Sequence, residues 1–327
     1  MMNKEPLIVI IGAGSIGERH IRNLWQLGYR NMIVFRQRNL PFRDIGEAQV
    51  TVSLNWEEVL NKKPFAAFIC TPTSQHLEQV KNCLQNNMHV FVEKPLSHNL
   101  ENIEELKSIA SNSNKLLQIG FMMRFHPLIL KVKNYIEDKT FGNLISTASH
   151  WGSYLPDWHP WENYKESYAA NKSLGGGVAL TLCHDIDLAI WLSGSAVKKF
   201  ETIKSHSNEL DINAESVADI KINFESGVIS NIHLNYLDNP PIRKYTWQFE
   251  NANLELDYFA NRLSINPEQN IGAVQEIKLE SFDRNQMFLA EINSFFNNIE
   301  IKNNNTQYSL NQIIESELLI SICNYAD

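Results

Sequence analysis

Cysteine is scarce in this sequence of 327 residues, and basic residues are outnumbered by acidic ones. The cysteines include no C-x-x-C pair and stand far apart, at Cys70, Cys83, Cys183 and Cys323. This spacing favours reduced thiols over a disulfide framework or a zinc site, and we expect no metal centre. Lysine and arginine number 29 against 37 aspartates and glutamates, a formal net charge of -8. Without a basic excess, nucleic acid is not an expected partner.

Long hydrophobic runs are also missing. The longest early apolar run, 7–11, is far shorter than the roughly 20 residues that a membrane span needs. We therefore expect neither a secretory signal nor a membrane partner, and we expect a cytoplasmic protein. With only 14 glycines and 11 prolines, the chain is not collagen-like or of low complexity, and 43% hydrophobic residues suffice for packed cores.

Up to about residue 120, short apolar runs alternate with helical patterns. The expected strands cover 7–11, 32–35, 50–53, 65–70, 89–92 and 116–119. The expected helices cover 15–27, 56–61, 74–86 and 100–111. This alternation predicts an α/β domain over residues 1–120, with a doubly wound parallel sheet of the Rossmann type.

The pattern changes after residue 120. Alternating strand patterns run from about 197 to 277 and include a hairpin signal, the turn Glu225-Ser226-Gly227 between two apolar-alternating runs. Helical patterns return over 286–298 and 311–324. We therefore expect a second domain over 121–327, of α+β type with a largely antiparallel open sheet, for substrate binding and oligomerisation. Its C-terminal helix is a candidate to pack back on the first domain.

A glycine motif lies directly between the first expected strand and helix. It reads Gly12-Ala13-Gly14-Ser15-Ile16-Gly17, a G-x-G-x-x-G. Gly12 permits the tight turn, Gly14 lets the backbone approach a pyrophosphate, and Gly17 lets helix and strand pack closely. The free amides at the helix start, where Ser15 and Ile16 stand, attract the anion. The motif predicts a dinucleotide site; the alternative is a glycine turn without a ligand.

The end of the second expected strand carries arginines. A site for NAD normally places an acidic residue there to bind the ribose hydroxyls, but this chain has Arg36 and Arg38. Guanidinium groups can bind a 2′-phosphate through two parallel hydrogen bonds and stack beside adenine. We therefore favour NADP(H) over NAD(H), the alternative being two solvated arginines in a surface loop.

Two polar segments follow the fourth and fifth expected strands, at the sheet edge where α/β folds bind ligands. They read Ile69-Cys70-Thr71-Pro72-Thr73-Ser74-Gln75-His76 and Val92-Glu93-Lys94-Pro95. Further motifs are Gly120-Phe121-Met122-Met123-Arg124-Phe125-His126-Pro127, Gly175-Gly176-Gly177, His184 with Asp187, and Glu215-Ser216-Val217-Ala218. With these motifs the sequence resembles, over nearly its whole length, the Gfo/Idh/MocA family of NAD(P)-dependent oxidoreductases.

The resemblance implies that Lys94 of E-K-P is the catalytic acid/base, with His184 assisting, and that the Lys94-Pro95 bond is cis. The implied cofactor contacts are Cys70, Thr71, Pro72, His76, Glu93 and Lys94. The chemistry agrees, because an amine beside a nicotinamide can exchange a proton with the substrate oxygen while hydride moves at carbon. The alternatives are a solvated lysine for Lys94 and a hydrogen-bonded helix histidine for His184.

One position departs from the family pattern. Many relatives carry an aspartate four residues before the histidine, where this chain has Leu180, followed by Thr181. The pattern over 175–187 resembles a branch found in bacterial surface-glycan pathways, in which aspartate is frequent where Thr181 stands. On a helix that begins near Gly177, Thr181, His184 and Asp187 would share one face and form a relay or a substrate clamp.

An aromatic segment follows in the expected second domain. Tyr154, Trp158 and Tyr168 are candidate substrate contacts, because sugars present apolar C–H faces to aromatic rings. Such a segment can equally cover a sheet or seal an interface between copies. Arg124 can anchor a carboxylate or phosphate, or it can bridge the two domains.

These features predict an enzyme, a dehydrogenase or reductase acting on CH–OH groups. It would move a hydride between NADP(H) and a hydroxyl or keto group of a sugar or sugar derivative, including nucleotide-linked sugars. We expect a homodimer or homotetramer that forms through the C-terminal sheet. One alternative is a glycosidase that oxidises and re-reduces its sugar transiently with tightly held cofactor. The other is a non-catalytic protein that senses cofactor or sugar, which the missing aspartate allows and the intact E-K-P disfavours.

Overall fold

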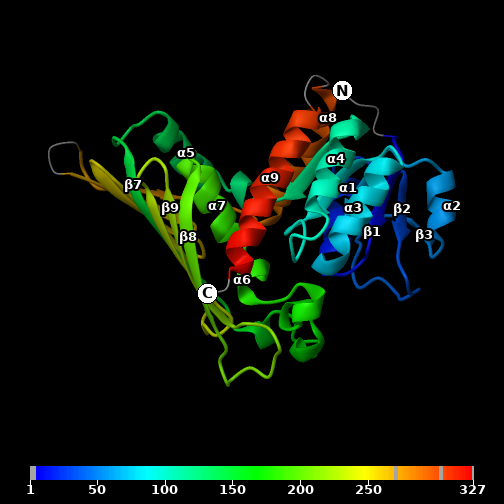
Figure 1. The fold of residues 1–327 in the computed structure, drawn as a ribbon, viewed down its shortest axis with the longest axis horizontal. Helices are drawn as coiled ribbons and strands as arrows, with labels where there is room; N and C mark the ends of the chain where they lie inside the picture. The colour runs from blue at the N-terminus through cyan, green and yellow to red at the C-terminus, as the bar shows by residue number, and fades with distance from the viewer. Residues whose placement is uncertain (1–4, 269–271, 302–304, 326–327) are drawn as a thin grey trace. The chain divides into compact units, whose positions relative to one another are not determined.

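The computed structural model describes residues 5–268, 272–301 and 305–325 (Figure 1). The chain divides into two compact units. Unit 1 comprises Met1–Phe121 and Asn285–Leu318, and unit 2 comprises Met122–Arg284 and Leu319–Asp327. The expected boundary at residue 120 lies beside the first junction, but a later segment of the expected second domain belongs to unit 1.

Unit 1 contains a parallel sheet of six strands in the order β3-β2-β1-β4-β5-β6. The strands are β1 (Ile8–Ile11), β2 (Met32–Phe35), β3 (Thr51–Ser53), β4 (Ala66–Ile69), β5 (His89–Glu93) and β6 (Leu117–Gly120). The helices between them are α1 (Ser15–Gln26), α2 (Trp56–Asn61), α3 (His76–Gln85) and α4 (Ile103–Ser113). The expected Rossmann-type sheet is confirmed, and each expected strand overlaps the observed one.

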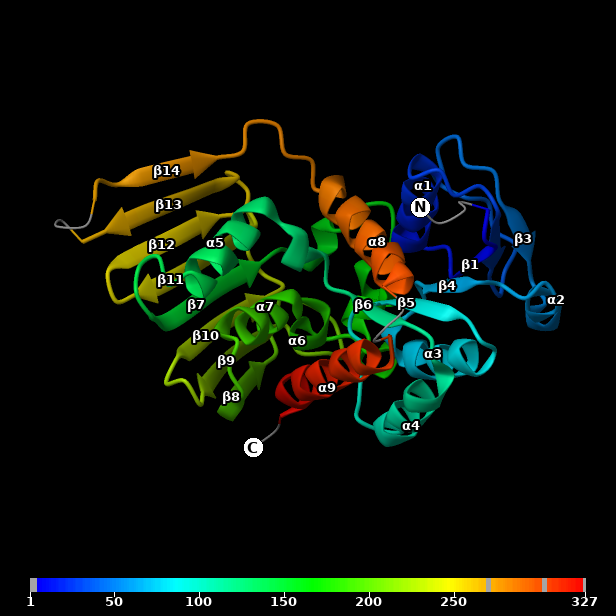
Figure 2. The same cartoon turned by 90° about the horizontal axis from the view of Figure 1, so that it is seen from above.

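The core of unit 1 follows from the apolar runs of its central strands. Every residue of β1, β4 and β5 is buried, because helices cover both faces of a parallel sheet. Figure 2 shows α1 and α8 (Asn285–Glu300) on one face and α3 and α4 on the other. From α8, the Phe295 ring packs 5.5 Å from the ring of Phe68 on β4, so a helix distant in sequence completes this core.

Most of helix α9 (Asn305–Asn324) belongs to unit 1, and hydrogen bonds to an edge strand explain why. β6 ends the sheet, so one side of its backbone has no neighbouring strand. The Leu117 amide donates to Ser309 Oγ at 2.8 Å, and the Ile119 amide donates to Gln312 Oε1 at 3.1 Å. Side chains of α9 thus satisfy edge amides that would otherwise be unpaired or open to another strand.

Unit 2 contains a sheet of eight strands in the order β14-β13-β12-β11-β7-β10-β9-β8. The strands are β7 (Leu144–Gly152), β8 (Val197–Ser205), β9 (Val217–Phe224), β10 (Ile229–Asn235), β11 (Ile242–Phe249), β12 (Ala252–Asp257), β13 (Arg262–Pro267) and β14 (Gln275–Lys278). Only β7 and β10 pair in parallel; the other neighbours are antiparallel. The largely antiparallel sheet and the hairpin at Gly227 are confirmed.

Helices cover one face of this sheet. They are α5 (Pro127–Glu137), α6 (Val178–Thr181) and α7 (His184–Ser193), as Figure 2 shows. On β9, Ala218 and Ile220 are buried while Asp219 and Lys221 are exposed, which is the alternation of a half-covered strand. On this strand the outward side chains are therefore polar and the inward ones apolar.

In the part of the chain that the structure describes, short 3-10 helices connect these elements: η1 (Thr73–Gln75), η2 (Met122–Phe125), η3 (Leu155–Asp157), η4 (Tyr164–Glu166), η5 (Tyr168–Ala170) and η6 (Lys172–Leu174). Within the described residues, no single helix has the length and apolar character to cross a membrane. One bent pair, 172–181 with 184–193, passes that test by length and composition alone.

Candidate functional site

The glycine motif forms the turn from β1 into α1. Gly12 has a φ of +91°, and a Cβ on Gly17 would lie 2.2 Å from the carbonyl oxygen of Gly12, so the protein itself requires both glycines. Gly14 differs, because a Cβ there would meet nothing within 4 Å. No side chain caps the first amides of α1. An uncapped helix start beside open space at Gly14 fits the pyrophosphate of a dinucleotide.

Arg36 begins the loop after β2. Its guanidinium lies 4.3 Å from the centre of the Phe42 ring and donates to Asn39 Oδ1 at 3.4 Å, whereas Arg38 is exposed. The loop is held by Glu18, a buried residue of α1 that our sequence analysis did not select. Its carboxylate accepts the backbone N–H groups of Arg43 at 2.9 Å and Asp44 at 3.1 Å.

His76 joins the two polar segments at the ends of β4 and β5. Nδ1 lies 2.8 Å from the Pro95 carbonyl oxygen, and Nε2 lies 2.8 Å from the Thr71 carbonyl oxygen. Burial lowers the pKa of His76, although both carbonyl contacts oppose this. The Lys94-Pro95 bond is cis, as predicted. The imidazole therefore links the backbone that follows β4 to the backbone that follows β5.

Glu93 is buried at the end of β5, next to half-buried Lys94. His20 of α1 donates to its carboxylate at 2.7 Å. Burial would raise the pKa of Glu93, but the His20 hydrogen bond and the charges of His20 and Lys94 hold it below the ordinary value. Glu93 therefore carries a negative charge in unit 1. His20 was missed; its position three residues after Gly17, on the face of α1 that packs on the sheet, is the signal that could have found it.

Cys70 is a neutral thiol in this setting. Burial, with a further contribution from the charge of Glu93, raises the pKa of Cys70 well above its ordinary value. Its neighbour Thr71 donates to Gln79 Oε1 at 2.6 Å, and Pro72 is half-buried. The C-T-P segment thus has its polar groups satisfied by the surrounding chain.

The helix expected around His184 is broken, so that prediction is wrong. Thr181 ends α6 and His184 begins α7. The segments 172–181 and 184–193 are bent by 51°, so Thr181 and His184 do not belong to one helical face. Neither glycine nor proline marks the break, and it was not visible in the sequence. Both residues are buried.

Asp187 and Arg124 form a two-point ion pair within unit 2. Arg124 Nε donates to Oδ2 at 3.0 Å and NH2 donates to Oδ1 at 2.6 Å. The Asp187 side chain is 3% exposed and that of Arg124 is 16% exposed. The two candidate substrate contacts thus neutralise each other, and Arg124 pairs inside its own unit.

The aromatic candidates lie in different surroundings. Trp158 donates from Nε1 to Ser153 Oγ at 3.0 Å and packs edge-on against Tyr236, 5.4 Å between ring centres. Tyr154 is half-buried, and its amide bonds the carbonyl of Asp238. Tyr168 is exposed. Trp158 is therefore part of the packing of unit 2, and Tyr168 is the most accessible of the three.

Sequence analysis missed a buried hydrogen-bonded group at Asp185, the residue after His184. Asp185 accepts from Arg243 NH2 at 3.0 Å and from the Tyr245 hydroxyl at 2.9 Å. Burial raises the pKa of Asp185, while Arg243 and Tyr245 oppose the rise. The partners are far apart in sequence, so no local signal could have found this group.

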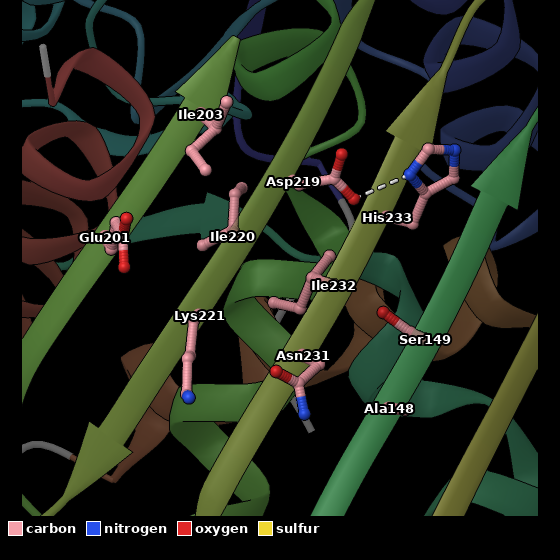
Figure 3. A pocket seen from close by; sticks show the side chains of 10 residues that line it. All are labelled: Ala148, Ser149, Glu201, Ile203, Asp219, Ile220, Lys221, Asn231, Ile232 and His233. Atoms are coloured by element: carbon pink, nitrogen blue, oxygen red, sulfur yellow. Dashed lines mark hydrogen bonds and ion pairs between the residues drawn. The ribbon is translucent and has the colours of Figure 1, made fainter.

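A hollow of about 390 Å³ lies on the outer face of the unit 2 sheet. Figure 3 shows the side chains that line it. Its wall includes Ile203, Asp219, Lys221 and His233, and a 2.8 Å hydrogen bond joins His233 to Asp219. None of the site candidates lies in it. Among the described residues, no three His, Cys, Asp or Glu side chains are arranged to hold a metal ion. The four cysteines are buried and form no disulfide within that part of the chain.

Known families match both parts of the chain. The model described as "Oxidoreductase family, NAD-binding Rossmann fold" matches residues 7–121, and that of the GFO/IDH/MocA C-terminal domain matches 129–250. An uncharacterized oxidoreductase, YrbE of Bacillus subtilis, is 28% identical over 204 residues, covering 60% of this chain and 56% of YrbE. Levoglucosan dehydrogenase of Pseudarthrobacter phenanthrenivorans is 27% identical, covering 57% of this chain and 50% of the relative.

The aligned region thus spans about half the length of these curated relatives. A solved structure of levoglucosan dehydrogenase in complex with NADH and levoglucosan superposes with a TM-score of 0.78, covering 97% of this chain and 98% of that one at 15% identity. At that identity the superposition supports the fold alone. Both halves of the chain match models of one family, and the chain belongs to the Gfo/Idh/MocA family of oxidoreductases.

Proposed function

We propose that this protein is an NAD(P)-dependent oxidoreductase that transfers a hydride between the cofactor and a hydroxyl or keto group of a sugar or sugar derivative. The observation that supports this proposal most directly lies in unit 1. The open, uncapped helix start at Gly14 and the E-K-P lysine both stand at the carboxyl edge of one parallel sheet, which is where such folds bind ligands. The named activities of the relatives, on levoglucosan and inositol, support a sugar-like substrate.

We assign proton transfer and cofactor binding to separate residues of the chain. A nicotinamide cofactor bound by these residues would supply the hydride chemistry. Lys94 Nζ takes the hydroxyl proton when the alcohol is oxidised and returns it when the ketone is reduced. His184 is the proposed helper in proton transfer, and Gly12, Gly14, Ser15, Ile16 and Gly17 are proposed to bind the pyrophosphate. Cys70, Thr71, Pro72, His76 and Glu93 shape the nicotinamide side.

Unit 2 is proposed to bind the substrate. Thr181, Tyr154, Trp158 and Tyr168 supply hydroxyl and ring contacts, and the Arg124–Asp187 pair shapes the wall without a net charge. The 175–187 pattern supports a place in the surface-glycan branch, so nucleotide-linked sugars belong in any substrate panel. Homodimers or homotetramers are proposed to form through the outer sheet face, where charges of both signs alternate between neighbouring strands, as at Glu201 and Lys221.

The function is tested by removing the proposed acid/base. Lys94→Ala should lower kcat about a hundredfold or more and leave NADPH binding nearly intact, because the phosphates are held by the glycine loop. His184→Ala should cost less. The measurements are NADPH fluorescence titration and turnover over a panel of keto sugars, polyols and nucleotide-linked sugars.

Two outcomes would replace this proposal. NADPH binding without turnover by either wild type or Lys94→Ala would favour the sensor. A nicotinamide retained through purification, with no turnover of added NADP, would favour the transient-redox glycosidase.

Cofactor preference is tested separately at Arg36. We propose that NADPH binds more tightly than NADH, because Arg36 and Arg38 replace the expected acid and can pair with the 2′-phosphate. Arg36→Glu should reverse the ratio of the two Kd values, and Arg30→Glu, at an exposed arginine before β2, is the matched control. Equal Kd values in wild type, or a ratio that Arg36→Glu leaves unchanged, would refute the preference.

A further inference from the structure

The imidazole of His184 lies against an indole ring. The His184 and Trp151 ring centres are 6.2 Å apart, with planes inclined by only 25°. Trp151 belongs to β7, at the inner face of the sheet, and is half-buried, while His184 is 3% exposed. The His184 ring therefore has a flat neighbour that limits the orientations it can take.

The buried guanidinium of Arg243 stacks on the same indole. Trp151 is the direct cross-strand partner of Arg243 on β11, and the guanidinium carbon lies 3.6 Å from the indole ring centre. The Arg243 side chain is itself 3% exposed. A planar guanidinium stacks flat on an aromatic face, in a way that a lysine ammonium does not.

Three further groups fix the guanidinium. Nε donates to the Tyr245 hydroxyl at 2.7 Å and NH2 donates to Asp185 at 3.0 Å. The same hydroxyl donates to Asp185 at 2.9 Å, and the Tyr258 ring centre lies 4.9 Å from the guanidinium carbon. Asp185 directly follows His184 in the first turn of α7. A continuous series of contacts therefore runs from Asp185 through Arg243 and Trp151 to His184.

Stability alone does not account for this arrangement. Desolvation largely offsets the attraction within a buried ion pair, and well-packed apolar residues in its place are often as stable or more stable. What apolar residues would not reproduce is the orientation of the indole. We propose that Arg243 and Trp151 are positioning residues for His184: the buried guanidinium fixes the indole, and the indole fixes the imidazole. This inference rests on the proposed function only in giving His184 a catalytic task.

The test compares two buried aromatic positions of one sheet. Phe249 is buried on β11, and its ring centre lies 6.0 Å from that of Phe141, so Phe249→Leu removes a ring that does not stack on Arg243, Trp151 or His184. Trp151→Leu should lower kcat by about ten- to a hundredfold, the range that misplacement of a catalytic group produces. Phe249→Leu should leave kcat essentially unchanged, and Trp151→Phe, which keeps a ring, should recover part of the activity.

A second variant separates position from stability. In Asp185→Leu/Arg243→Met the charges are replaced by apolar side chains, so the melting temperature should hold while kcat falls as in Trp151→Leu. A fall in melting temperature that accounts for the lost activity in both this variant and Trp151→Leu would overturn the proposal.

A direct readout does not depend on activity. In full-length protein with 13C-labelled histidines, the His184 signal is assigned by its absence in His184→Asn. It should move in Trp151→Leu through loss of the indole ring current and stay in place in Phe249→Leu. A His184 signal unmoved in Trp151→Leu overturns the positioning role. A moved signal in a protein that turns over no sugar keeps the positioning and refutes the proposed function instead.

Discussion

The candidate site residues of unit 1 are positioned mainly by backbone conformation and backbone contacts, whereas those of unit 2 are positioned mainly by buried ion pairs. In unit 1 the essential features are the positive φ of Gly12, the contact of Gly17 with the Gly12 carbonyl, and the carbonyls that hold His76. In unit 2 they are two ion pairs on the first turns of α7, Asp185–Arg243 and Asp187–Arg124.

The difference has a physical origin. A turn that admits a pyrophosphate needs bare backbone amides, and only glycine leaves them uncovered. A wall that orients a polar substrate carries polar side chains on buried elements, and buried charges persist only when each has a partner. The two units should therefore respond differently to substitution.

The largest expected effect is the loss of a charge in the interior of unit 2. Asp185→Ala leaves the Arg243 cation buried without a counterion, and we expect a loss of about 3–5 kcal/mol in the free energy of unfolding. The matched control is Asp219→Ala on the outer face of the same sheet. Its side chain is 61% exposed and pairs with His233, so the loss should stay below about 1 kcal/mol. Urea denaturation of the three proteins measures both, and equal losses would contradict the assignment of Asp185.

A smaller effect should separate two glycines of unit 1. In Gly17→Ser the new Cβ meets the Gly12 carbonyl, so we expect a loss of about 1–3 kcal/mol even without cofactor. Gly14 has extended backbone, with φ -78° and ψ -168°, and open space. Gly14→Ser should therefore keep stability, because serine is a favoured helix N-cap, yet weaken NADPH binding about tenfold or more. Unchanged NADPH affinity in Gly14→Ser would remove the main support for the pyrophosphate site.

The smallest expected effect is a pH dependence of stability that arises from a buried histidine in each unit. Each buries a histidine whose pKa is lowered to about 4 chiefly by desolvation, His89 in unit 1 and His126 in unit 2. Each also accepts a backbone N–H at Nδ1, from Leu116 and Leu128 respectively. Since the unfolded chain takes up these protons near pH 6.5, stability should fall as pH drops from 6.5 towards 4.

The loss at pH 5 should reach up to about 2 kcal/mol for each histidine. His126→Asn keeps an N-cap acceptor for α5 but cannot titrate, so its loss between pH 7 and pH 5 should be smaller than that of wild type by up to the same amount. Unfolding by urea at the two pH values measures this. A pH dependence identical to that of wild type would mean that His126 is protonated in the folded protein or contributes nothing.

Sequence reasoning succeeded where the signal is local. The strands of unit 1 were predicted from short apolar runs, and the glycine turn from residues adjacent in the chain. It failed at Thr181 and His184, where a helix breaks without glycine or proline. Sequence reasoning assigned 285–318 to the second domain, with the C-terminal helix as a candidate to pack back on the first. Nothing local shows that Ser309 and Gln312 accept amides of β6.

By itself, then, the sequence determined the elements, the alternation of their faces and the glycine loop, since propensity, period and backbone freedom are properties of neighbouring residues. Only the tertiary structure decided which charges are available to a ligand. The sequence offered Arg124 as an anion anchor or a domain bridge and Asp187 as part of a relay or substrate clamp, but the two become partners when η2 meets α7. Asp185 and Arg243, 58 residues apart, meet only when α7 packs on β11. Folding pairs such charges because an unpartnered buried ion is too costly to keep.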